Sequence, residues 1–116
     1  MGIGYAVEKL GSAVHHAMQS TESLQQRIAG CCLNFGGLSH HDHLPPDLKL
    51  RFDAIMTACT REPDPTGSHG TIVTTAAIME AQEASELLGK IHSLYADVIA
   101  REQRELIARE ITAVRP

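Results

Sequence analysis

The sequence predicts an all-α protein, a compact bundle of four or five helices with a long C-terminal helix. Apolar residues recur at steps of three and four through most of the chain, which is the period of one helix face. The five prolines lie in connections, at a helix start or at the chain end. At 116 residues the chain fits one domain, so we expect a single helical domain over residues 1–116.

The first part of the chain predicts two helices. The first covers residues 4–18, where apolar side chains form one stripe. Ser20 or Thr21 then suits an N-cap for the second helix, because either hydroxyl can accept a backbone N–H bond there. Gly36 and Gly37 are expected to end this helix, since glycine accepts the left-handed conformation of a C-terminal cap.

A third helix is predicted from Pro46, where the missing N–H of proline costs nothing and its fixed φ suits a first turn. Asp47 adds a negative charge near the positive end of the helix dipole. Its apolar stripe continues to Cys59, and residues 62–70 follow as a loop rich in proline and glycine.

From Thr71 the apolar positions hold helical phase nearly to the end of the chain, with an expected break near residues 79–82. This predicts a short helix and then a long one. We expect residues from about 100 to 116 to form a helical tail that outruns the bundle and carries a narrow aliphatic stripe. Such a stripe would face water unless covered, so it predicts a dimer contact. The predicted interaction residues are Ile99, Leu106, Ile107 and Ile111.

A dense polar cluster falls in the connection before the third helix, at His40, His41, Asp42 and His43. Imidazole and carboxylate groups are suitable transition-metal ligands. Adjacent loop residues rarely all face one ion, so the other interpretation is a solvated loop with Asp42 as a turn residue. The H-E-x-x-H and Glu-x-x-His helix patterns are missing. The cluster gives an alternative function, a transition-metal-binding protein or metalloenzyme.

The net charge and the cysteines indicate which classes of partner and which cellular compartment to expect. The net charge is −4, and the C-terminal arginines alternate with glutamates, which argues against nucleic acid as the main partner. No apolar run approaches the ~20 residues of a membrane span. The three cysteines occupy apolar helix positions, and reduced thiols fit a cytoplasmic protein. We therefore expect a cytoplasmic protein that binds neither nucleic acid nor a membrane.

The sequence does not show candidate catalytic residues in a recognisable pattern. The segment 67–71 lacks the Gly-x-x-x-x-Gly-Lys phosphate pattern, so we interpret Ser68 or Thr71 as a helix cap. We interpret His92 as a histidine at the boundary between the apolar and polar faces of the long helix. The sequence therefore favours a small soluble, non-catalytic protein without a cofactor. It would act as an adaptor or inhibitor, through a protein partner or as a homodimer.

Overall fold

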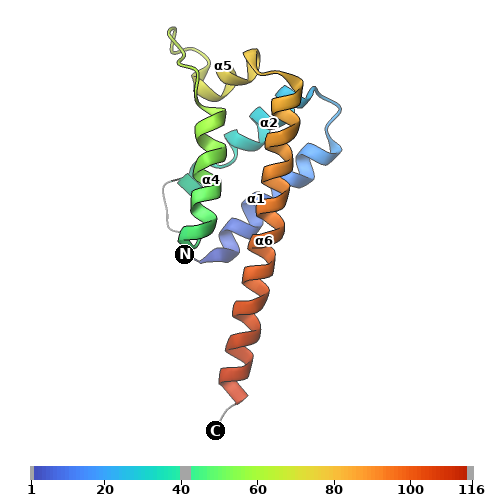
Figure 1. Cartoon of the computed structure of the whole chain (residues 1–116), viewed down its shortest axis with the longest axis vertical. Helices are drawn as coiled ribbons and strands as arrows, with labels where there is room; N and C mark the ends of the chain where they lie inside the picture. Colours follow the sequence, from blue (N-terminus) through green and yellow to red (C-terminus); the bar gives the residue numbers. More distant parts are fainter. Residues whose placement is uncertain (1, 40–42, 115–116) are drawn as a thin grey trace.

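The computed structural model describes residues 2–39 and 43–114, and six helical segments occur in these residues (Figure 1). Only α3, a single turn of four residues, is too short to count as a bundle helix, and the described ranges contain no strand. The all-α bundle with a long C-terminal helix is therefore confirmed. The segments are α1 (Ile3–Gln19), α2 (Leu24–Leu33), α3 (Gly36–Ser39), α4 (Pro46–Cys59), α5 (Gly70–Ile78) and α6 (Ala81–Val114).

The start of α2 differs from the expectation, because Ser23 rather than Ser20 or Thr21 is the N-cap. The Ser23 hydroxyl accepts the Gln26 backbone N–H at 3.1 Å, and the Gln26 side chain accepts the Ser23 N–H at 3.1 Å. This reciprocal capping box satisfies two backbone donors at once. Ser20 instead ends α1, where its N–H bonds the carbonyl of His16.

The end of α2 also differs from the expectation. The helix ends at Leu33, before the glycine pair, and the chain then forms the short turn α3. Gly37 lies against Tyr5 of α1, and a Cβ at this position would overlap the Tyr5 hydroxyl. The second glycine of the pair thus makes room for a close approach of α1, a requirement that the local sequence pattern did not reveal.

The later helices begin where the sequence predicts. α4 starts at Pro46, and the long C-terminal segment breaks at Met79, within the predicted range 79–82. Met79 has an extended backbone conformation and a buried side chain. Its carbonyl accepts a hydrogen bond from the Gln25 side chain of α2 at 3.2 Å, which fixes the α5–α6 corner to the bundle.

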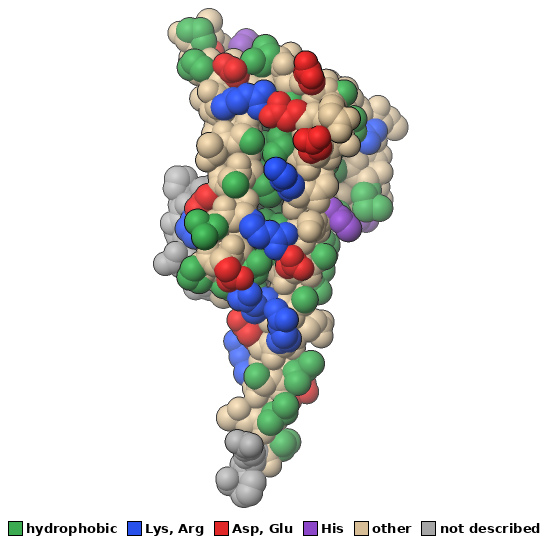
Figure 2. All heavy atoms as spheres, viewed as in Figure 1, with side chains coloured by type: hydrophobic (Ala, Val, Ile, Leu, Met, Phe, Trp, Pro, Cys, Tyr) green, Lys and Arg blue, Asp and Glu red, His purple; other side chains and the backbone are tan. Residues whose placement is uncertain are grey.

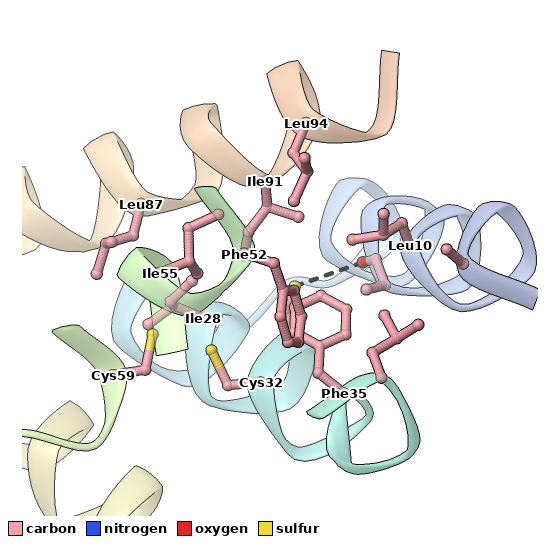
Figure 3. Packing of buried hydrophobic residues seen from close by; sticks show 14 of the residues in the cluster. Leu10, Ile28, Cys32, Phe35, Phe52, Ile55, Cys59, Leu87, Ile91 and Leu94 are labelled. Carbon is pink, nitrogen blue, oxygen red and sulfur yellow. Dashed lines mark hydrogen bonds between the residues drawn. The ribbon is translucent and has the colours of Figure 1, made fainter. Parts of the chain in front are cut away.

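The hydrophobic core lies where α6 meets α1, α2 and α4 (Figure 3). At its centre the rings of Phe35 and Phe52 meet edge to face, with 5.6 Å between their centroids. Gly11 lets the α6 ring of Tyr95 lie close to α1, since a Cβ there would come within 3.0 Å of the Tyr95 hydroxyl. The buried side chains that α6 contributes are Ala84, Leu87, Ile91, Leu94 and Val98.

The molecule is elongated because α6 is much longer than the bundle that surrounds its first part. The described chain measures 62 × 27 × 18 Å along its principal axes, and α6 has 34 residues. Figure 1 shows its C-terminal part projecting beyond the other helices. We call residues 102–114 the tail. The N-terminal end of α1 reaches the first turns of the tail, beside Glu102 and Leu106.

Candidate protein interaction surface

The tail carries four large aliphatic side chains that are exposed to solvent. The exposed fractions are 44% for Leu106, 53% for Ile107, 53% for Ile111 and 81% for Val114. We call these four residues the tail stripe. Three of the four predicted interaction residues belong to it, whereas Ile99 is half-buried at the edge of the bundle. Figure 2 shows hydrophobic side chains gathered along the right edge of the tail.

The tail stripe does not continue the core-facing side of α6. At about 100° of rotation per residue, Ile107, Ile111 and Val114 lie nearly opposite the buried positions of α6. Leu106 lies roughly 80° from the buried positions, beside the start of α1. Lengthening the bundle along α6 would therefore leave the stripe uncovered. A surface that covers it must approach from the outer side of α6.

A cleft with a volume of about 340 Å³ opens between α1, α2 and α6. Its walls include apolar side chains, among them Met18, which is 78% exposed. Gly89 lies in the α6 wall, and a Cβ added there would meet no atom within 4 Å. We call this the α1–α6 cleft. The residues that line it are Val14, Ala17, Met18, Arg27, Cys31, Leu88, Gly89, Ile91 and His92.

The sequence pattern does not reveal this cleft, because its lining comes from three helices that only the tertiary structure brings together. His92 was expected at a polar–apolar boundary, and the structure places it as an exposed residue that lines the cleft. Arg27 of α2 brings a positive charge to the same cleft, and its Nε donates to the Glu22 carbonyl at 2.9 Å. The cleft thus combines apolar walls with hydrogen-bond donors.

The opposite flank of α6 is closed by ion pairs to α4 and to the residues that follow it. Arg51 pairs with Asp97, and Arg61 pairs with Glu83. Nearer the tail, the Arg101 guanidinium lies 2.8 Å from the Asp47 carboxylate, and this hydrogen bond lowers the pKa of Asp47. Blue and red side chains alternate over this face in Figure 2.

The stretch 62–97 is acidic, and Lys90 is its only basic residue apart from histidine. Two of its acids, Glu83 and Asp97, are neutralised by arginines from the α4 side. The α4 flank of α6 is therefore an internally satisfied surface of mixed charge.

All three cysteines are buried, free thiols within the core. The Cys31 thiol donates to the Ala13 carbonyl of α1 at 3.5 Å, drawn as the dashed line in Figure 3, and burial raises its pKa to about 11. A hydrogen bond between Cys32 and Cys59, together with burial, raises the pKa of Cys32 as well. Figure 3 shows this pair linking α2 to α4. The same hydrogen bond lowers the pKa of Cys59. Enclosed thiols of this kind serve packing rather than nucleophilic chemistry.

The predicted metal cluster is described only at His43. This side chain is 3% exposed, and its ring lies 4.3 Å from the ring of Tyr5, tilted by 39°. His40, His41 and Asp42 lie outside the described residues, so the four-residue metal site stays a prediction. Within residues 2–39 and 43–114, no group of three or more His, Cys, Asp or Glu side chains is close enough to hold a metal ion.

The loop before α5 is organised by Asp64 rather than by the expected caps, Ser68 or Thr71. The Asp64 carboxylate accepts the backbone N–H groups of His69 and Gly70, each at 2.8 Å. These bonds and one from Thr66 hold the pKa of Asp64 well below its usual range. A carboxylate of the chain itself thus meets the backbone donors at the start of α5, where the sequence showed no phosphate-binding pattern.

No helix in the described parts of the chain combines the length and apolar character needed to cross a membrane. No family model, curated protein or solved structure matches the chain. The tail stripe, the α1–α6 cleft and the α4 flank of α6 are therefore the features that bear on function.

Proposed function

We propose that this protein acts through protein–protein contact, as a homodimeric adaptor or inhibitor of non-catalytic type, with the α6 tail as its self-association surface. One observation carries the proposal: four aliphatic side chains, 44–81% exposed, stand together at the end of a continuous helix. Fully burying one such side chain contributes roughly 1.5–3 kcal/mol relative to leaving it in water. A stripe of this size is a contact surface without its counterpart.

The polar residues around the stripe suit pairing between helices. Arg104 and Glu110 flank it with opposite charges. Aliphatic stripes bordered by mixed charges are typical of helices that pair in water, where the apolar seam supplies affinity and the flanks select the partner. The same mixture, with a net charge of −4, suits a protein partner better than a nucleic acid backbone.

The polar contacts between segments of the bundle support a non-catalytic role. Arg51, Arg61 and Arg101 make ion pairs with acids on neighbouring helices, and the Ser23 and Asp64 side chains cap helix starts. Each of these groups is engaged in holding the fold. The buried thiols suit a compartment in which cysteine stays reduced, which supports the proposal of a cytoplasmic location.

Sedimentation equilibrium of an Ile107→Asp/Ile111→Asp variant tests the proposal. Because a charged side chain cannot be buried without a large cost, the variant is expected to raise the dimer dissociation constant by roughly tenfold or more, which corresponds to about 1.4 kcal/mol. Leu50→Asp is the control, since Leu50 is a 73% exposed leucine of α4 that does not belong to the tail stripe.

Two results would overturn the proposal. One is a wild-type protein that stays monomeric at high concentration and co-purifies with no partner from its native host. The other is a dimer whose dissociation constant is the same in the double variant and in wild type. Circular dichroism of each variant establishes that any loss of association occurs without loss of helix.

A further inference from the structure

We infer that the tail stripe of one chain docks into the α1–α6 cleft of a second copy, so that two α6 helices pair antiparallel and exchange tails across a two-fold axis. This inference rests on the proposed self-association, and it adds the receptor surface and the orientation. The occupant of the cleft is thus a second copy of this chain, and the contact is made twice in each dimer.

The positions of the two features along α6 favour a second copy over the chain's own tail. The cleft lies beside Gly89, and the stripe includes Ile111. At a rise of about 1.5 Å per residue, these two positions are about 33 Å apart along the α6 axis. Both lie on one uninterrupted helix, Ala81–Val114, so a chain cannot bring its own tail to its own cleft. In an antiparallel pair centred near Ala100, Ile111 of each chain falls opposite Gly89 of the other.

The rotation of the two features about the α6 axis also agrees. Gly89 of the cleft lies on the same side of the helix as Ile107 and Ile111 of the tail stripe, within roughly 40° of either at about 100° per residue. On this side, between the cleft and the stripe, Ala96 and Ala100 are exposed and carry only a methyl group. Small side chains at a helix crossing allow a short distance between the axes.

The chemistry of the cleft matches that of the tail. Exposed Met18 and the neighbouring apolar walls offer a lining for the Ile107 and Ile111 side chains, and the missing side chain of Gly89 leaves space for them. Glu110, exposed beside the stripe, would meet the positive charge of Arg27 and the imidazole of His92. Opposite charge across the contact favours this pairing.

A parallel pair lacks these features. In a parallel, in-register pair each residue faces its own copy, so Glu110 would lie near Glu110 and Arg104 near Arg104. Like charges placed opposite one another are unfavourable, and both clefts and both Met18 side chains would remain in water. Charge and burial therefore both favour the antiparallel pair.

Disulfide cross-linking between mixed single-cysteine variants tests the orientation. A Gly89→Cys chain is mixed with an Ile111→Cys chain, equilibrated and briefly oxidised, with wild type as the background because its own thiols are buried. The antiparallel dimer predicts several-fold more covalent dimer in the mixture than in either variant alone. The control mixture pairs Gly89→Cys with Arg109→Cys, an exposed tail position on the opposite side of the helix, and is expected to stay at the background level.

An Ala100→Cys variant separates failure of the orientation from failure of the proposed function. Position 100 faces its own copy in either orientation, so this variant cross-links with itself whenever two α6 helices pair. Strong cross-linking at position 100, together with cross-linking of Ile111→Cys to itself, would establish a parallel pair. That result would overturn the antiparallel inference but leave the proposed self-association standing. A protein that is dimeric by light scattering but cross-links at none of these positions would also overturn it. A monomer would overturn the proposed function as well.

Discussion

The two halves of α6 have the same helical geometry but opposite surroundings. In the bundle half, Leu87, Ile91, Leu94 and Val98 are each at most 4% exposed. In the tail half, Ile107 and Ile111 are 53% exposed, and they lie on nearly the opposite side of the helix. The bundle half is therefore covered within one chain, whereas the tail half leaves its aliphatic side chains in water.

An apolar stripe at helical spacing can therefore serve either folding or association. Where other helices of the chain surround it, the stripe becomes core and contributes to the free energy of folding. Where the chain leaves it uncovered, its burial contributes only to association. Substitutions in the two halves should therefore change different measured quantities.

The largest expected difference comes from matched truncations in the two halves. Leu94→Ala removes a side chain that is 0% exposed and should lower the free energy of unfolding by about 2–5 kcal/mol. Ile107→Ala should change it by about 0.5 kcal/mol or less, because its side chain lies outside the core. Urea unfolding at a protein concentration low enough to keep the chain monomeric measures both. Equal losses of unfolding free energy in the two variants would contradict the distinction between the bundle half and the tail half of α6.

An alkaline titration tests how tightly the bundle side is enclosed. The pKa of Cys31 is raised to about 11 by burial, above its ordinary value of 9.0, so the native state favours the protonated thiol. The resulting stability is fully present below pH 9 and is lost as the pH rises toward 11, by roughly 2–3 kcal/mol. Urea unfolding of wild type and Cys31→Ala across this range measures the effect. We expect the difference in unfolding free energy between wild type and Cys31→Ala to shrink as the pH rises. A difference that stays constant with pH would show that the Cys31 thiol is not enclosed.

The smallest expected effect concerns the α4 flank of α6. Asp97→Asn removes an exposed ion pair with Arg51, and such pairs contribute about 0–1 kcal/mol because water and salt screen them. The free energy of unfolding should therefore fall by less than about 1 kcal/mol, and by less still in high salt. The dimer dissociation constant should not change, since this flank lies away from the cleft. A marked loss of dimer in Asp97→Asn would show that the dimer contact lies on the α4 flank of α6, and would contradict the proposed contact at the cleft.

Periodicity and helix punctuation predicted much of this architecture. The start of α4 at Pro46, the break at Met79 and the exposed side chains of Leu106, Ile107 and Ile111 all follow from local pattern. These features depend on residues close together in sequence, which is why spacing alone reveals them.

Other features depend on tertiary contacts that spacing cannot encode. Gly37 was interpreted as part of a helix end, yet its role is set by Tyr5 of another helix. The α1–α6 cleft gathers Met18, Arg27 and His92 from three helices. The Ser23 cap is a different case, because its capping box with Gln26 is a local pattern that the sequence does contain.

The most direct test of the account is the molar mass of the wild-type protein in solution, measured by light scattering over a range of concentrations. The account predicts a rise to about 25 kDa, twice the 12.6 kDa of one chain, as the tails become buried. A mass that stays at 12.6 kDa up to high concentration would contradict the central claim that the tail stripe pairs with a second copy.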